Sequence, residues 1–159
     1  CCYGAILARV LLGRAHSATA VAGNLVKRGL DAEDNGVMLL QYPGALAIAE
    51  ASWTQVGKLT SYVTAIYGTE GTLLIEPENG TLLHATAKHP EGREVTVPES
   101  PPHLENPTAH FLWGIEDDHA FQPLCRPGNN VDAQEMLIAG LEAASSGQRI
   151  ELPQLEEMD

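Results

Sequence analysis

The sequence predicts an α+β domain, in which a large and mostly antiparallel β-sheet has helices packed on one face. Short β-rich segments follow one another through the middle of the chain, and they are separated by tight-turn signals such as Pro43-Gly44 and Asn79-Gly80. Helical patterns stand at the two ends of the chain. Because successive short strands joined by tight turns run in alternating directions, we expect an antiparallel meander.

The first expected element is a helix over Tyr3–Leu12, where nearly every position except Arg9 is apolar and Gly13 follows as a C-terminal cap. Ser17–Val26 alternates loosely and predicts the first strand, and a polar connection follows up to Asp34. The remaining expected strands are Gly36–Tyr42, Leu46–Gln55, Thr60–Tyr67, Thr72–Glu76, Thr81–Ala87, Arg93–Val97 and Arg149–Leu152.

Two helices are expected towards the end of the chain. Asn106-Pro107 offers a cap residue followed by proline at the first helical position, which predicts a helix over Thr108–Glu116. Gln122–Asn130 is expected to be a loop. The run Asp132-Ala133-Gln134-Glu135 has the spacing of a capping box, and apolar residues continue from there at helical intervals until Gly147.

One predicted strand has an unusual face. Residues 45, 47, 49 and 51 are all alanine and lead to Trp53, whereas Leu46 and Ile48 belong to the opposite face. A sheet that is apolar on both faces needs cover on both sides, and helices can cover one of them. We therefore expect Ala47 and Ala49 to lie at a subunit interface; the alternative is a sheet that curls over its own loops.

Composition excludes several classes of function. The net charge is −12, and none of the nine Lys and Arg residues belongs to a basic run longer than two, which argues against binding of nucleic acid or of an anionic membrane surface. No apolar stretch approaches the ~20 residues that span a bilayer, and the start of the chain lacks a signal-peptide pattern. We expect a cytoplasmic protein with three reduced thiols.

A metal site is not expected. His103, His119 and Asp117-Asp118 have a spacing that fits no compact tetrahedral set, and proline-containing loops separate them.

Four motifs together indicate a family: Cys1-Cys2-Tyr3-Gly4-Ala5, Glu33–Pro43, Ala49–Gln55 and Tyr67–Leu73. Their succession resembles the C-terminal domain of the Gfo/Idh/MocA oxidoreductases, which include glucose–fructose oxidoreductase and inositol dehydrogenase. Relatives of this kind bind NAD(H) or NADP(H) on an N-terminal Rossmann domain and oxidise or reduce a sugar, cyclitol or related polyol. Their second domain supplies substrate contacts and the oligomer interface.

The resemblance implies that residues 1–159 form a single substrate-binding and oligomerisation domain of such an enzyme, which self-associates through its sheet. The chain has neither the Gly-x-Gly-x-x-Gly fingerprint nor the family's Glu-Lys-Pro motif. We therefore expect NAD or NADP to serve the parent enzyme and not to bind to this chain, which alone would be inactive.

The resemblance also implies a catalytic candidate. Tyr3 aligns with the His or Tyr of a family motif whose Asp would fall two residues before Cys1. A tyrosine beside a lysine can relay the proton of the substrate hydroxyl if its pKa is brought down towards the working pH. The alternative is that Tyr3 is an aromatic core residue at the start of a helix.

Four further residues are candidates for substrate contact. Asp34 and Asn35 are polar residues at the start of a strand, where such residues also occur for structural reasons. Trp53 can stack on a sugar, or it can anchor the alanine row. His110 stands beside aromatic residues on a short helix, where a histidine is often structural.

Two rival functions remain open from the sequence. The first is a self-associating β-sheet interaction module without a catalytic role. The second is a sugar-binding domain that binds no nucleotide.

Overall fold

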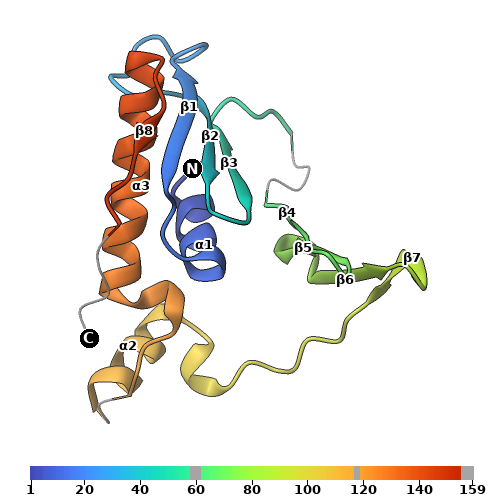
Figure 1. Cartoon of the computed structure of the whole chain (residues 1–159). Helices are drawn as coiled ribbons and strands as arrows, with labels where there is room; N and C mark the ends of the chain where they lie inside the picture. Colours follow the sequence, from blue (N-terminus) through green and yellow to red (C-terminus); the bar gives the residue numbers. More distant parts are fainter. Residues whose placement is uncertain (58–61, 117–118, 155–159) are drawn as a thin grey trace. The chain divides into compact units, whose positions relative to one another are not determined.

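The computed structural model describes residues 1–57, 62–116 and 119–154 (Figure 1). The chain divides into two compact units: the first unit comprises Cys1–Gln55 and Phe111–Asp159, and the second unit comprises Val56–His110. The predicted α+β class is confirmed, and every pair of neighbouring strands is antiparallel in the described residues. The strands form two four-stranded sheets, however, where the sequence predicted one large sheet.

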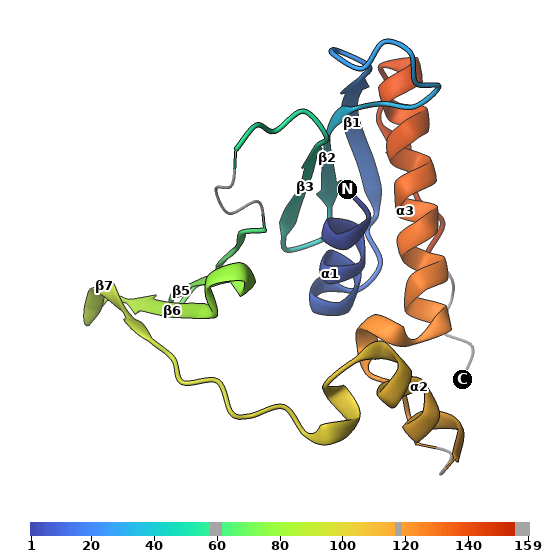
Figure 2. The ribbon, with the colours of Figure 1, turned by 180° about the vertical axis from the view of Figure 1, so that it is seen from behind.

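The first unit contains a sheet with the strand order β3-β2-β1-β8 and two helices that lie along one side of it (Figures 1 and 2). A third helix, α2, covers Pro107–Glu116 and begins in the second unit. The elements of the first unit are α1 (Cys2–Leu12), β1 (Ser17–Gly23), β2 (Asn35–Gln41), β3 (Leu46–Ser52), α3 (Pro127–Ser146) and β8 (Ile150–Glu151).

The core of the first unit lies between the sheet and helices α1 and α3. Ala5 of α1 and Leu40 of β2 are fully buried, and Met38 and Met136 are nearly so. Small residues on α1 allow a close approach to β3: a Cβ atom placed on Gly4 would lie 2.7 Å from the Cβ of Ala49. Burial of this apolar surface is the main favourable contribution to the stability of the unit.

The alanine face of β3 therefore packs inside the protomer. Ala49 is 3% exposed and belongs to the core, so the prediction of a subunit interface at Ala47 and Ala49 is wrong. The physical reason is that alanine leaves room for a helix backbone, and α1 fills that room. The opposite face of the same sheet is exposed and apolar. We call Val21, Val37, Leu39, Leu46 and Ile48 the outer face.

Helix α3 begins at Pro127, within the segment that the sequence predicted to be a loop. Pro127 occupies the first helical turn, where its missing N–H costs nothing. Asp132 consequently lies inside the helix and caps nothing, so the predicted capping box is wrong. The first part of that segment forms a short 3₁₀ turn, Pro123–Cys125.

The second unit is a meander with the strand order β4-β5-β6-β7. Its last strand begins at His89, earlier than the predicted start at Arg93, and it contains Pro90 and Gly92. This strand lies at the edge of the sheet, where a proline is tolerated. The predicted strand from Thr60 starts outside the described residues. None of the apolar residues that the structure describes in this unit is buried. The strands are β4 (Thr64–Tyr67), β5 (Thr72–Glu76), β6 (Thr81–Thr86) and β7 (His89–Glu94).

Two predicted caps are confirmed. Gly13 ends α1 with a φ of 84°, a conformation that favours glycine, and its N–H donates to the carbonyl of Arg9. Asn106 accepts a hydrogen bond from the N–H of Ala109 at 2.9 Å and so satisfies one of the first free donors of α2.

Candidate functional site

Three of the predicted site residues meet at one end of the first sheet. Asp34 and Asn35 lead into β2, and Trp53 follows β3, whose Ser52 pairs with Asn35. The backbone N–H of Trp53 donates to the carbonyl of Asp34 at 2.7 Å. These three residues form the candidate site.

The start of α1 lies near the same two strands. The thiol of Cys1 is 3.6 Å from the carbonyl oxygen of Gly36 and 3.4 Å from that of Ala49. Tyr3, two residues further along the chain, is 63% exposed. The alternative that Tyr3 is a buried core residue is therefore wrong, while its catalytic role stays a prediction.

Asp34 organises the loop between β1 and β2. Its carboxylate accepts hydrogen bonds from the backbone N–H groups of Leu25, Val26 and Lys27 at 2.8, 2.8 and 2.7 Å. The side-chain amide of Asn35 donates to the same carboxylate at 2.9 Å. The backbone hydrogen bonds, with that of Lys27 first, hold the pKa of Asp34 far below its usual range. Because Asp34 is 2% exposed, this geometry favours a structural role.

Asn35 is tied into a chain of polar side chains. Its amide oxygen accepts a hydrogen bond from the hydroxyl of Thr54 at 3.3 Å, and the hydroxyls of Thr54 and Ser52 are 3.0 Å apart. These hydrogen bonds fix the orientation of the polar side chains next to Trp53 in the sequence and in the sheet.

Trp53 is 67% exposed, so the alternative that it anchors the alanine row is wrong. The ammonium group of Lys27 lies 5.5 Å from the centre of its ring. A cation at this distance is attracted to the electron-rich face of an indole. Sequence reasoning missed Lys27, although two adjacent basic residues, Lys27 and Arg28, in an acidic chain were a signal that could have found it.

His110 lies in the second unit and is not part of this cluster. It is 7% exposed in the first turn of α2, and its ring stacks on that of His103 with 6.3 Å between the ring centres. Burial and stacking favour the structural role that the sequence left open.

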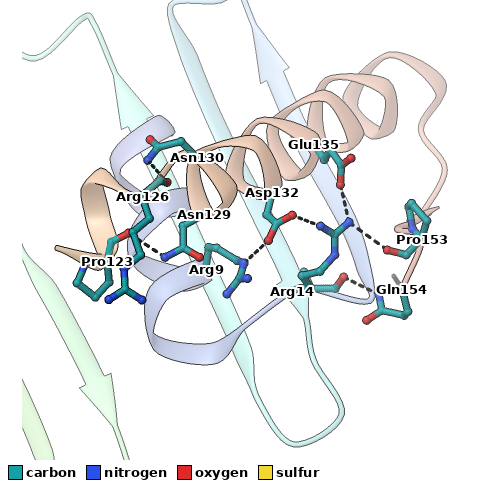
Figure 3. Close-up of polar contacts among 11 residues, drawn as sticks. Arg9, Arg14, Pro123, Arg126, Asn129, Asn130, Asp132, Glu135, Pro153 and Gln154 are labelled. Atoms are coloured by element: carbon teal, nitrogen blue, oxygen red, sulfur yellow. Dashed lines mark hydrogen bonds and ion pairs between the residues drawn. The ribbon is translucent and has the colours of Figure 1, made fainter. Parts of the chain in front are cut away.

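A second polar cluster joins α1, α3 and the end of the chain, and we call it the arginine cluster (Figure 3). Arg9 pairs with Asp132 at 2.6 Å, and Arg14 pairs with both Asp132 and Glu135. Arg14 also donates to the carbonyl of Pro153 at 3.2 Å. The carboxylates that the sequence assigned to a helix cap thus bind two arginines across the core.

Two hollows of the described surface lie away from the candidate site. One is beside the arginine cluster, and one of about 230 Å³ lies between α3 and β8, next to Ile138 and Ile150. At the candidate site itself, the ring of Trp53 is exposed.

The described residues offer no cradle for a dinucleotide. Dinucleotides bind at the carboxyl ends of parallel strands, beside a glycine-rich turn that opens a helix. All strand pairs described here are antiparallel. The described residues therefore form no Rossmann-type site for NAD or NADP.

The described residues form neither a metal site nor a membrane-spanning helix. Within them, no group of three or more His, Cys, Asp and Glu side chains is arranged to hold a metal ion; the sequence candidates Asp117 and Asp118 lie outside the described part. In the same part of the chain, no helix combines the length and apolar character needed to cross a bilayer.

Comparison with known families agrees with this architecture. Residues 1–74, just under half of the chain, match the family model described as the GFO/IDH/MocA C-terminal domain. The resemblance inferred from the sequence is thereby confirmed. No curated protein matches the chain in sequence.

Solved structures show the same fold at low sequence identity. A candidate oxidoreductase from Thermotoga maritima matches with a TM-score of 0.78 and 16% identity, over 95% of this chain and 45% of its own. Levoglucosan dehydrogenase, in complex with NADH and levoglucosan, gives 0.72 and 19%, over 96% and 49% of the two chains. The WlbA dehydrogenase from Bordetella pertussis, with NADH and UDP-GlcNAcA, gives 0.67 and 21%, over 96% and 44%. This chain spans about half the length of each of these proteins.

Proposed function

We propose that this chain, which carries a Gfo/Idh/MocA C-terminal domain signature in residues 1–74, is the substrate-binding and oligomerisation part of an NAD(P)-dependent oxidoreductase. The substrate is a sugar, cyclitol or related polyol. The observation that carries the proposal is the family match combined with a fold shared over 95% or more of this chain with proteins of about twice its length.

NAD or NADP would bind to a nucleotide-binding domain outside these residues, since the antiparallel strands described here do not fit it. In this proposal the chain supplies the substrate side of the active site, in a cytoplasmic enzyme. The structural relatives that were solved with levoglucosan or UDP-GlcNAcA support a sugar as the substrate class.

Tyr3, Asn35 and Trp53 would contact the substrate. The exposed ring of Trp53 offers a flat apolar surface of the kind on which a sugar ring stacks. Tyr3 would accept or return the proton of the reacting hydroxyl. Asp34 would act by holding the loop beside them. His110, which lies in the second unit, stays a prediction as a substrate contact.

Self-association would use the outer face of the first sheet. Five apolar side chains lie there, three of them at positions 21, 46 and 48 that are 77%, 65% and 71% exposed. A contiguous apolar surface of this kind marks an interaction site. This observation also favours the second candidate function, an interaction module without catalysis.

The test is an assay of the protein encoded by the complete reading frame. We expect reduction of NAD⁺ or NADP⁺, followed by absorbance, with at least one member of a panel of sugars and cyclitols. Tyr3→Phe should lower kcat by about 10²–10⁴-fold with little change in KM. Tyr67→Phe is the matched control, because Tyr67 is 83% exposed in β4, and it should leave kcat unchanged.

An oligomeric protein without any nucleotide-dependent activity would support the interaction module instead. Sugar binding without nucleotide binding by the complete protein would support the sugar-binding domain. Full activity in Tyr3→Phe would remove Tyr3 from the catalytic group.

A further inference from the structure

The loop between β1 and β2 is rigidly built. Asp34 binds three of its backbone N–H groups, as described above. From the other end of the loop, the amide of Asn24 donates to the carbonyls of Leu30 and Ala32 at 2.7 and 3.1 Å. Two side chains thus fix a connection that would otherwise lose much conformational entropy on binding a ligand.

Lys27 and Trp53 are positioned by the same residue. The N–H of Lys27 donates to the carboxylate of Asp34, and the N–H of Trp53 donates to its carbonyl, both at 2.7 Å. The Lys27 ammonium then stands 5.5 Å from the centre of the indole ring. The exposed ring and the cation over it form one surface, which we call the Lys27–Trp53 platform.

The cations of this loop are not paired with any carboxylate that the structure describes. The chain holds nine Lys and Arg residues against 21 Asp and Glu residues. In the first unit, Arg9, Arg14 and Arg149 are paired with carboxylates. Lys27 and the adjacent Arg28 form no ion pair with any residue that the structure describes. The same loop carries the carboxylates of Asp31, Glu33 and Asp34, so Lys27 and Arg28 would attract an anion as direct charged partners and not through a net positive charge of the loop.

From these observations we propose that Lys27 and Arg28 bind the acidic group of an anionic sugar, a sugar acid or a sugar phosphate, whose ring lies on Trp53. The proposal rests on the proposed function and narrows its substrate class. Carboxylate and phosphate both form charge-assisted hydrogen bonds with Lys and Arg. A neutral polyol would leave both cations without a partner.

The test follows the indole N–H signal of Trp53 by NMR in this chain, with Trp53→Phe used to assign the signal. D-glucose, D-glucuronate and D-glucose 6-phosphate are titrated in turn at low ionic strength. We expect at least one of the two anionic ligands to bind about tenfold more tightly than D-glucose. Added NaCl should weaken that preference, because the charges involved are exposed. Tighter binding of D-glucuronate would indicate a sugar acid as the ligand, and tighter binding of D-glucose 6-phosphate would indicate a sugar phosphate.

Variants separate a specific role from net charge. Lys27→Met and, independently, Arg28→Met should each reduce the preference for the anion by about fivefold or more. Lys88→Met changes the net charge equally at an exposed position of the second unit, and it should keep the wild-type preference. Two independent variants keep the test valid if one of them folds poorly.

The possible failures are distinguishable. Equal affinity for D-glucose and both anions, with a clear shift of the Trp53 signal, would overturn this inference and leave the proposed function standing. Unchanged preference in both Lys27→Met and Arg28→Met would also overturn it. No shift with any of the three ligands would count against the inference and against the proposed substrate-binding role together.

Discussion

At the scale of single residues, the geometry of the candidate site depends on the hydrogen-bond partners of the buried carboxylate of Asp34. Asp34 resembled a substrate ligand in the sequence, but its carboxylate accepts hydrogen bonds from the backbone of its own loop. A carboxylate that receives several N–H donors is stabilised in its charged form. Its role in the structure is therefore to hold the backbone of Lys27 and Trp53 in place.

Asp34→Asn should loosen the loop, because an amide cannot accept all the bonds that the carboxylate accepts. The amides of Leu25, Val26 and Lys27 should exchange faster with deuterium, which NMR can follow residue by residue. The pKa of Asp34 is depressed in the folded state, so its stabilisation is present above the unfolded pKa of about 3.9 and is lost as the pH falls below it. The difference in stability between wild type and Asp34→Asn should shrink below about pH 4. A constant difference across that range would contradict this assignment.

Tyr42 is expected to lose its contribution to stability at alkaline pH, whereas Asp34 loses its contribution at acidic pH. The residue is 6% exposed, its hydroxyl has no hydrogen-bond partner among the described residues, and burial raises its pKa to about 12. Since an unfolded tyrosine ionises near pH 10, the stabilisation is present below about pH 10 and is lost as the pH rises towards 12. Tyr42→Phe should remove this loss, as measured by urea unfolding at several pH values. A Tyr42→Phe protein that loses stability as steeply as wild type would exclude Tyr42 as its source.

At the scale of elements, the approach of α1 to β3 depends on small side chains. Gly4→Ala would place a Cβ atom 2.7 Å from that of Ala49 and 3.2 Å from its Cα, and backbone cannot move aside cheaply. We expect a loss of about 1–3 kcal/mol in the free energy of unfolding. Gly128→Ala is the control, because its Cβ meets nothing within 4 Å in the first turn of α3. That variant should gain up to about 1 kcal/mol from helix propensity. Equal effects of the two substitutions would refute close packing at Gly4.

The arginine cluster fastens three elements together. Arg14→Met keeps the aliphatic stem but leaves Asp132 and Glu135 without one of their partners and frees the carbonyl of Pro153. We expect a loss of about 2 kcal/mol, since hydrogen bonds to charged groups are stronger than neutral ones. Arg149→Met breaks an exposed pair with Glu151 and should cost at most about 1 kcal/mol. Chemical unfolding measures the free energy of unfolding of both variants. A smaller loss of stability for Arg14→Met than for Arg149→Met would contradict a stabilising role of the arginine cluster.

At the scale of the whole molecule, the outer face of the first sheet has the apolar surface that an assembly requires. Ile48→Glu would bury an unpaired charge in an interface formed there, and we expect self-association to weaken by at least about tenfold. Val131→Glu makes a similar change at a position of α3 that is 60% exposed and should leave the oligomer intact. Sedimentation velocity over a range of concentrations measures both. A monomeric wild-type protein, or an Ile48→Glu protein of unchanged size, would exclude this face.

Local signals in the sequence were sufficient where a structure depends on neighbouring residues. The end of α1 at Gly13, the cap at Asn106 and the turn at Asn79-Gly80 follow from backbone conformation and short-range hydrogen bonds. Alternation of side chains also predicted β2 and β3 and their antiparallel pairing. The family resemblance predicted the chemistry to be expected, and residues 1–74 confirm that resemblance.

Only the tertiary structure decided which face of a strand is buried and which distant residues a side chain contacts. The alternating pattern of β3 separates its two faces, but it does not say which face α1 will cover, because alanine suits both a helix contact and a subunit contact. Asp132 has the spacing of a cap, yet it lies inside α3, which starts earlier, and it pairs with Arg9 of α1 and with Arg14, which follows α1. Lys27 reaches Trp53 only because Asp34 folds the loop back. Sequence patterns encode periodicity and local geometry, whereas burial and pairing depend on residues far apart in the chain.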